Sequence, residues 1–390
     1  MFRANEVRRY LGEHKSEFLD VERELRENLR TLRTSAAELL SLPGAQVLDR
    51  LGWPRERPGA FPTPEWDRAA GHWLPFEGGP AVGASNQKWI SWAETVLRGA
   101  TTLAVDGSQI FPSRDWSVPV AAVQVAWFEN RHATGPDNYL KDVILRPVSP
   151  AELLAGGEDE VSLREKVSRI RYELEVETLA SWMSANRGGR RLALFDGSLV
   201  VSFATAPQER RRYVGAVLDL MRASEEAETP LVAYIDSSRA RDLAQMYSAL
   251  AGLGETRITD GALLPQPAWG SRTPVFICAR AQGLENYGDH TRKVCFLYLQ
   301  SSRDGRPARV EFPLWILEAG RVDEVVNMLR AEIVAQAAGY PYAIETVDAL
   351  AVLTNEDRLQ FESIFQEFAE ANGLQMQLRA KAASKRLRRR

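Results

Sequence analysis

The chain has 390 residues, of which 45% are hydrophobic and 26% charged, a composition typical of a globular protein with a sizeable core. Its formal net charge of -3 gives no general attraction to nucleic acid, so any basic surface must be local. Cys278 and Cys295 lie in apolar segments, where buried reduced thiols are expected, and two cysteines build neither a disulfide framework nor a zinc site. No signal peptide is recognised, and no apolar run approaches the ~20 residues that cross a bilayer, so we expect a cytoplasmic protein without membrane association.

The N-terminal part combines a long helix with a segment rich in proline and tryptophan. Apolar residues recur at three- and four-residue steps over residues 5–42, which predicts one helix, ended by Pro43 and Gly44. Its narrow apolar stripe fits either a partner subunit or its own domain. Residues 43–100 are expected to be irregular, and their tryptophans would either stack on unpaired bases or fix a long loop to the domain.

The central part alternates strands and helices in an informative order. Short connections between the first three strands predict an antiparallel meander, and a turn at residues 156–159 separates this meander from the next helix. The predicted strands are 101–106, 118–128, 142–148, 191–196 and 231–236, and the predicted helices are 161–185 and 207–227. Three meandering strands followed by helix, strand, helix and strand indicate an α/β fold with a mixed sheet flanked by helices, the order of ribonuclease-H-like nucleases.

The last part adds further elements and a basic tail. Helices are predicted at 240–253, 322–338 and from 343, with strands at 274–280, 293–300 and 308–314. Seven of the final twelve residues are basic, which is typical of a solvated end that would also attract phosphate non-specifically. We therefore predict three regions: an N-terminal helix and irregular segment (1–100), a central domain (101–355), and a C-terminal helix with the tail (356–390).

One motif occurs twice, as LAVDGS at residues 103–108 and LALFDGSL at 192–199. Either copy alone would be read as a turn, because Asp-Gly is ordinary turn chemistry. The repeated apolar lead-in reverses that preference and predicts two buried strands that each end on an aspartate, bringing Asp106 and Asp196 together. Carboxylates held close are costly to keep ionised unless a cation lies between them, and oxygen ligands select Mg²⁺ or Mn²⁺.

A metal-dependent phosphodiester cleavage needs further carboxylates. The helix at 161–185 precedes the second strand and offers Glu173, Glu175 or Glu177, among which helical periodicity does not choose. Ser108 and Ser198 have no histidine placed to activate them, so serine hydrolase chemistry is rejected. The phosphate-binding motif GxxxxGK[ST] is also absent, so movement driven by ATP would need a partner. His290, Asp236 and Asp260 are expected to be structural or turn residues.

Together with the two DGS strands, three further elements resemble the NurA nuclease family over about residues 100–355: the Arg171-to-Glu175 helix, TDGALL at 259–264 and GYPYAIETVDAL at 339–350. The resemblance implies a ribonuclease-H-like homodimer that uses Mn²⁺ or Mg²⁺. It also implies the site residues, with Asp106, Glu175, Asp196 and Asp348 as metal ligands and Tyr340 as a further catalytic residue. Asp348 stands where family members commonly have His, so the chain keeps an oxygen ligand there but lacks an imidazole base.

The resemblance further implies a 5′-3′ exonuclease and single-strand endonuclease that acts on single-stranded DNA and duplex ends. It would work with the hexameric ATPase HerA in DNA end resection, double-strand break repair and homologous recombination. Two alternatives stay open. The chain could be a non-catalytic DNA-binding or scaffolding subunit of a motor complex, which is consistent with Asp348 in place of the usual His. It could also be an RNA-processing enzyme of the same fold.

Overall fold

The computed structural model describes residues 2–374 except 70, 82, 114, 115, 134, 136, 137, 156–159, 205, 304, 337 and 338. The turn predicted at 156–159 and the basic residues of the tail, which begin at Arg379, therefore lie outside the described residues. The chain forms two compact units. Unit 1 comprises residues 1–78, 235–285 and 291–310, and unit 2 comprises residues 79–234, 286–290 and 311–390.

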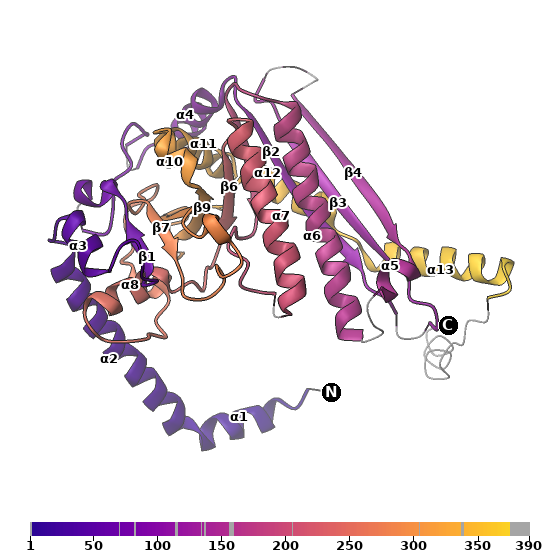
Figure 1. The fold of residues 1–390 in the computed structure, drawn as a ribbon, viewed down its shortest axis with the longest axis horizontal. Helices are drawn as coiled ribbons and strands as arrows, with labels where there is room; N and C mark the ends of the chain where they lie inside the picture. Colours follow the sequence, from indigo (N-terminus) through magenta and orange to yellow (C-terminus); the bar gives the residue numbers. More distant parts are fainter. Residues whose placement is uncertain are drawn as a thin grey trace. The chain divides into compact units, whose positions relative to one another are not determined.

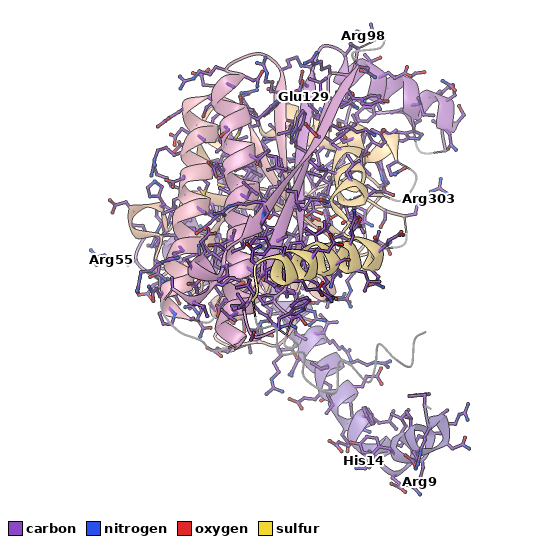
Figure 2. All side chains as sticks on the ribbon, turned by 90° about the vertical axis from the view of Figure 1, so that its right-hand side faces the viewer. Arg9, His14, Arg55, Arg98, Glu129 and Arg303 are labelled. Atoms are coloured by element: carbon purple, nitrogen blue, oxygen red, sulfur yellow. The ribbon has the colours of Figure 1, made fainter. Side chains whose placement is uncertain are left out.

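Unit 1 begins with the long amphipathic helix that the sequence predicts, interrupted at His14. The helix consists of α1 (Ala4–Glu13) and α2 (Lys15–Leu39), and the chain bends between them at His14, which Figure 2 labels. Most of its large apolar residues are exposed, and only Leu32, Ala36 and Leu39 at the end of α2 are buried. Pro43 ends the helix as predicted but also starts α3 (Gly44–Arg50), since a proline before a first turn costs no hydrogen bond.

The segment 43–100 is not irregular, contrary to the expectation from its prolines. It contains α3, β1 (Gly59–Pro62), a 3₁₀ helix (Pro64–Arg68) and, in unit 2, α4 (Asn86–Leu97). Strand β1 pairs antiparallel with β7 (Phe276–Ala279), which pairs with β8 (Val294–Leu299). Trp66 is buried against Phe276 and donates to the Leu42 carbonyl at 2.8 Å, so this tryptophan fixes the loop to its domain.

The rest of unit 1 surrounds a buried ion network. Its helices are α8 (Asp242–Leu250) and α9 (Asp260–Leu263), and β9 (Ala308–Pro313) begins in this unit. Arg280 and Arg309 both bind the buried Asp242, at 2.6 and 2.7 Å. Cys278 and Cys295 are buried and reduced, as predicted.

Unit 2 contains the predicted mixed sheet. Its strands are β2 (Thr101–Ile110), β3 (Ala121–Asn130), β4 (Tyr139–Val148), β5 (Arg191–Asp196) and β6 (Leu231–Ile235). They lie in the order β6-β5-β2-β3-β4. The meander β2-β3-β4 is antiparallel, whereas β5 pairs parallel with both β2 and β6. This arrangement confirms the ribonuclease-H-like prediction, because helical crossovers bring later strands back parallel to the first.

Helices cover the unit 2 sheet. Long helices α6 (Glu160–Ala185) and α7 (Pro207–Glu226) lie side by side over it (Figure 1), and α12 (Tyr342–Ala351) packs on β2 and β3. The remaining helices of this unit are α5 (Pro150–Leu154), α10 (Leu314–Glu318), α11 (Val322–Ala335) and α13 (Asn355–Ala371). Among the helices that the structure describes, none is both long and apolar enough to span a bilayer.

Candidate metal centre

Strand register places Asp106 beside Asp196. The parallel pairing of β2 with β5 runs from Thr101 opposite Arg191 to Val105 opposite Phe195, so the next residue on each strand is an aspartate. Neighbouring strands lie about 4.8 Å apart, which leaves the two carboxylates adjacent. Burial, together with the charge of Asp196, raises the pKa of Asp106 to about 6, although the Gly107 amide and Arg171 act in the opposite direction.

The two DGS copies differ in backbone. Strand β5 ends at Asp196, and Gly197 has φ = +153°, a conformation that L side chains rarely adopt. Strand β2 instead continues through the motif to Ile110, so the prediction that this strand ends at Asp106 is wrong. The pairing of Gly107 and Ser108 with β3 maintains the extended conformation there.

Glycine at position 107 lets the third carboxylate approach. Side chains alternate between the faces of a strand, so position 107 faces opposite to Asp106. A Cβ built on Gly107 would lie 2.6 Å from Oε1 of Glu175, 2.9 Å from the Gln124 carbonyl and 3.0 Å from Cγ of Arg171. Glu175 on α6 is therefore seated directly over the glycine. It is only 4% exposed, and burial with the nearby charge of Asp106 raises its pKa to about 7 against the effect of Arg171.

The three glutamates of α6 have different surroundings in the structure. Glu173 accepts a hydrogen bond from Arg169 at 2.6 Å. Glu173 and Glu177 both line a groove of about 830 Å³ between α6 and α7. Because Glu175 alone of the three lies over β2, that groove is separate from the carboxylate cluster.

The segment 340–348 supplies the remaining predicted residues. The Tyr340 hydroxyl donates to Oδ1 of Asp196 at 2.9 Å. Asp348 on α12 is exposed, and its negative charge acts on both Asp106 and Asp196. Burial raises the pKa of Asp196, the Tyr340 hydrogen bond lowers it, and Asp348 raises it. The structure therefore places Asp106 beside Asp196 and bonds Tyr340 to Asp196, while Asp348 and Glu175 lie near enough to interact electrostatically with Asp106.

Residues that the sequence did not nominate fix α12 at both ends. At its C-terminal end, Ser108 and Gln124 both donate to the Ala351 carbonyl, Gln124 at 3.2 Å. At its N-terminal end, the fully buried Glu332 accepts from the Ala343 amide at 3.0 Å and from the Thr102 hydroxyl at 2.8 Å. Glu332 is the one charged residue in the otherwise apolar run 331–335, a pattern that could have indicated a buried carboxylate with a structural partner. Ser108, which was rejected as a nucleophile, instead anchors this helix.

The residues set aside in the sequence have other surroundings. Ser198 donates to Glu311 at 2.7 Å, and His290 ends a short 3₁₀ helix (Gly288–His290). Asp236 is exposed in unit 1. Asp260 is fully buried there, accepting from Tyr298 at 2.7 Å and from the Ala244 amide at 2.9 Å. It belongs to the buried network of unit 1, a structural role, although the network itself was not foreseen.

The donor set fits a hard divalent cation. All four acidic residues offer only oxygen, and three of them have raised pKa values because burial and mutual repulsion disfavour their charges. Within the described residues, no group of three or more His, Cys, Asp or Glu side chains is already arranged to hold a metal. Arg171 is bound to Glu175 and Tyr340 to Asp196, so two of the four carboxylates are engaged by donors of the protein itself.

Three solved structures are similar to this chain at low sequence identity. The crystal structure of NurA with manganese has 10% identity and a TM-score of 0.40, covering 83% of this chain and 96% of that chain. The crystal structure of NurA has 9% identity and a TM-score of 0.41, covering 68% and 88%. The crystal structure of NurA bound to dAMP and manganese has 12% identity and a TM-score of 0.37, covering 79% and 92%.

No curated protein matches the chain. A family model described as the NurA domain matches residues 100–353, which is more than half of the chain and contains every residue of the carboxylate cluster. The match also spans the strands β2 to β6 and the helices α6 and α12 that position the cluster. The chain belongs to the NurA family.

Proposed function

We propose that this protein is a metal-dependent deoxyribonuclease that hydrolyses phosphodiester bonds at the carboxylate cluster of unit 2. The observation that carries the proposal is the register of β2 and β5, which sets Asp106 beside Asp196 while Glu175 approaches over Gly107. A chain that gathers charges of one sign in a partly buried place must offset their repulsion, and a divalent cation does so. Membership of the NurA family supports the same function.

Each residue has a distinct task in the proposed reaction. Asp106, Glu175, Asp196 and Asp348 would hold the cation, Mn²⁺ or Mg²⁺, through carboxylate oxygens. The bound ion would supply a Lewis acid that activates water and neutralises charge on the phosphate oxygens. Tyr340, whose hydroxyl now donates to Asp196, would orient the scissile phosphate or the attacking water. Asp348 cannot act as an imidazole base, so the proton from water passes to a carboxylate or to solvent.

For the substrate, we propose single-stranded DNA and duplex ends, degraded 5′ to 3′ together with a hexameric ATPase of the HerA type during end resection and repair. The support is membership of the family, together with the absence of a GxxxxGK[ST] motif from the sequence, which assigns the movement along DNA to a partner.

A pair of glutamate variants tests the site. Glu175→Gln removes a charge from the proposed ligand set, whereas Glu177→Gln makes the same chemical change two residues away, on the groove between α6 and α7. With labelled DNA and Mn²⁺, Glu175→Gln and Asp106→Asn are expected to reduce cleavage at least about a hundredfold, and Glu177→Gln to leave it unchanged. Equal activity of Glu175→Gln and Glu177→Gln would exclude this cluster as the reaction centre.

The competing function is a non-catalytic DNA-binding or scaffolding subunit. The feature favouring it is Asp348, which replaces an imidazole in a cluster where Arg171 already partly neutralises the charge. Degradation of a labelled single strand with Mn²⁺, measured with and without the motor, separates the two functions. DNA binding without Asp106-dependent cleavage in both conditions would establish the scaffold; an RNA substrate series run in parallel tests the RNA-processing alternative.

We also propose that a second copy of the chain pairs with β4. This strand ends the sheet of unit 2, and its residues 139–147 are all exposed, including Tyr139, Leu140, Val143, Ile144 and Leu145. Antiparallel pairing of two β4 strands about Ile144 would set Val143 opposite Leu145 and Asp142 opposite Arg146 of the other copy, twice by symmetry. Arg146 bonds the exposed Glu152 at 2.6 Å, and its guanidinium can turn from that surface partner to Asp142 of the other copy.

The oligomeric state tests this pairing. Ile144→Asp would place two carboxylates opposite each other at the symmetry axis, and sedimentation should then show a monomer. The matched control is Leu359→Asp on the exposed face of α13, which should stay dimeric. A wild-type protein that sediments as a monomer, or an Ile144→Asp variant that remains a dimer, contradicts the pairing.

A further inference from the structure

Arg171 is the cation within the carboxylate cluster. It lies on α6 one turn before Glu175, and its Nη1 atom donates both to Oε1 of Glu175 and, at 3.1 Å, to the Gly107 carbonyl. Its positive charge also offsets part of the rise in the pKa of Asp106 and of Asp196. Arg171 therefore acts on three of the four acidic groups. It already supplies part of the positive charge that a metal ion would bring to these carboxylates.

The hydrogen bonds of Arg171 leave its guanidinium with donors to spare. Its Nε atom is buried and has no hydrogen-bond partner among the described residues. Arg169, two residues earlier on the same helix, is different: its Nη1 binds Glu173 and its Nε binds Glu209, each at 2.6 Å. The side chain of Arg171 is 25% exposed, whereas that of Arg169 is 11% exposed. Arg169 is thus held between two helices, and Arg171 can turn.

We propose that Arg171 is a displaceable counter-cation of the carboxylate cluster: it neutralises Glu175 in the metal-free protein and turns to the substrate phosphate when Glu175 takes up the ion. This inference rests on the proposed function. Arg171 already donates to Oε1 of Glu175, and a metal ion bound at the same carboxylate would repel the guanidinium, so the two cations compete for Glu175. Once released, the guanidinium presents a planar fork of donors that matches phosphate geometry.

The proposal predicts that removal of the Arg171 charge changes the affinity for Mn²⁺ in the direction opposite to that expected if Arg171 were only structural. Loss of an ordinary structural ion pair would disorder Glu175 and weaken Mn²⁺ binding. Loss of a competing cation strengthens Mn²⁺ binding, because the metal no longer has to displace it. Arg171→Met keeps most of the aliphatic stem and removes the charge, and Arg169→Met is the matched control, since it removes another arginine–glutamate pair with the same four-residue spacing on α6.

Titration of the DNA-free protein with Mn²⁺, followed by the electron paramagnetic resonance signal of the free ion, measures this affinity directly. We expect Arg171→Met to bind Mn²⁺ about tenfold more tightly than the wild type, a size typical of one nearby charge, and Arg169→Met to bind as the wild type does. The same Arg171→Met variant should show a KM for DNA raised about tenfold or more. Unchanged or weaker Mn²⁺ binding by a folded Arg171→Met overturns the proposal.

Arg171→Lys provides the second test, also if the methionine variant fails to fold. Lysine keeps the charge but lacks the fork, so Mn²⁺ affinity should stay near that of the wild type while the KM for DNA rises. A KM for DNA that does not change in Arg171→Lys overturns the role in phosphate binding. Failure of the wild type itself to bind Mn²⁺ would instead refute the proposed function, so the two failures are distinguishable.

Discussion

Replacement of Gly107 by alanine tests how the candidate metal centre is built. The new Cβ would lie 2.6 Å from Oε1 of Glu175, 2.9 Å from the Gln124 carbonyl and 3.0 Å from Cγ of Arg171. The two side chains can move, but the Gln124 carbonyl belongs to the backbone of β3, which pairs with β2 along its length. Overpacking of this kind costs about 1–3 kcal/mol, so we expect the melting temperature of Gly107→Ala to fall by roughly 5 °C.

The displaced Glu175 also makes the variant informative about function. A shift of about 1 Å in a ligand or catalytic group can cost ~100-fold in rate, so Mn²⁺-dependent cleavage of labelled DNA by Gly107→Ala should fall by about that factor. Gly215→Ala on α7 is the matched control. A Cβ there meets nothing within 4 Å, and alanine favours a helix over glycine by about 1 kcal/mol, so this variant should be at least as stable as the wild type and equally active. If calorimetry and cleavage assays find Gly107→Ala equal to Gly215→Ala, then Glu175 does not lie over Gly107.

Three further outcomes are expected. Glu332→Ala should destabilise the protein by about 2–3 kcal/mol and speed hydrogen exchange at the Ala343 amide, because that amide and Thr102 lose their buried partner; unchanged exchange would show that Glu332 does not hold α12. Asp242→Asn should cost roughly 3–5 kcal/mol in denaturant unfolding, since it removes the buried carboxylate charge that Arg280 and the fully buried Arg309 both bind, and a near-neutral variant would contradict this network. Burial and the charge of Arg33 lower the pKa of His72 to about 4 from 6.5, so the unfolded chain takes up a proton before the folded protein does as pH falls through that range. The wild type should therefore lose about 2–3 kcal/mol of stability between pH 6.5 and 4 that His72→Gln does not lose, and parallel pH profiles of the two proteins would refute the assignment.

The sequence predicted the sheet of unit 2 well because its strands are bounded by clear signals. Apolar runs separated by turn residues predicted the bounds of β5 correctly, and they predicted the antiparallel order of the first three strands of this sheet. The end of β2 was mispredicted, because Asp-Gly-Ser is typical of a turn and only the pairing with β3 keeps it extended. The interruption at His14 was also missed, since apolar periodicity continues across it.

The sequence predicted that Asp106 and Asp196 lie side by side, but it did not predict the residues that support the candidate site. The repeated motif predicted that Asp106 and Asp196 are neighbours. The prediction holds because β2 and β5 pair in parallel, so that equivalent positions of the two motif copies lie side by side. Periodicity did not select Glu175, since the choice depends on the missing side chain at Gly107, a contact between residues far apart in sequence. The anchors of α12 are likewise long-range hydrogen bonds, from Ser108 to Ala351 and from Ala343 to Glu332, that leave no local pattern.

Anomalous diffraction from a crystal soaked with Mn²⁺ tests the central claim most directly. The structure predicts one or two peaks in contact with the carboxylates of Asp106 and Asp196, with Glu175 also bound and the guanidinium of Arg171 turned away from it. A peak at another place, or none at a Mn²⁺ concentration that supports cleavage of DNA, would contradict the proposal that these carboxylates form the reaction centre.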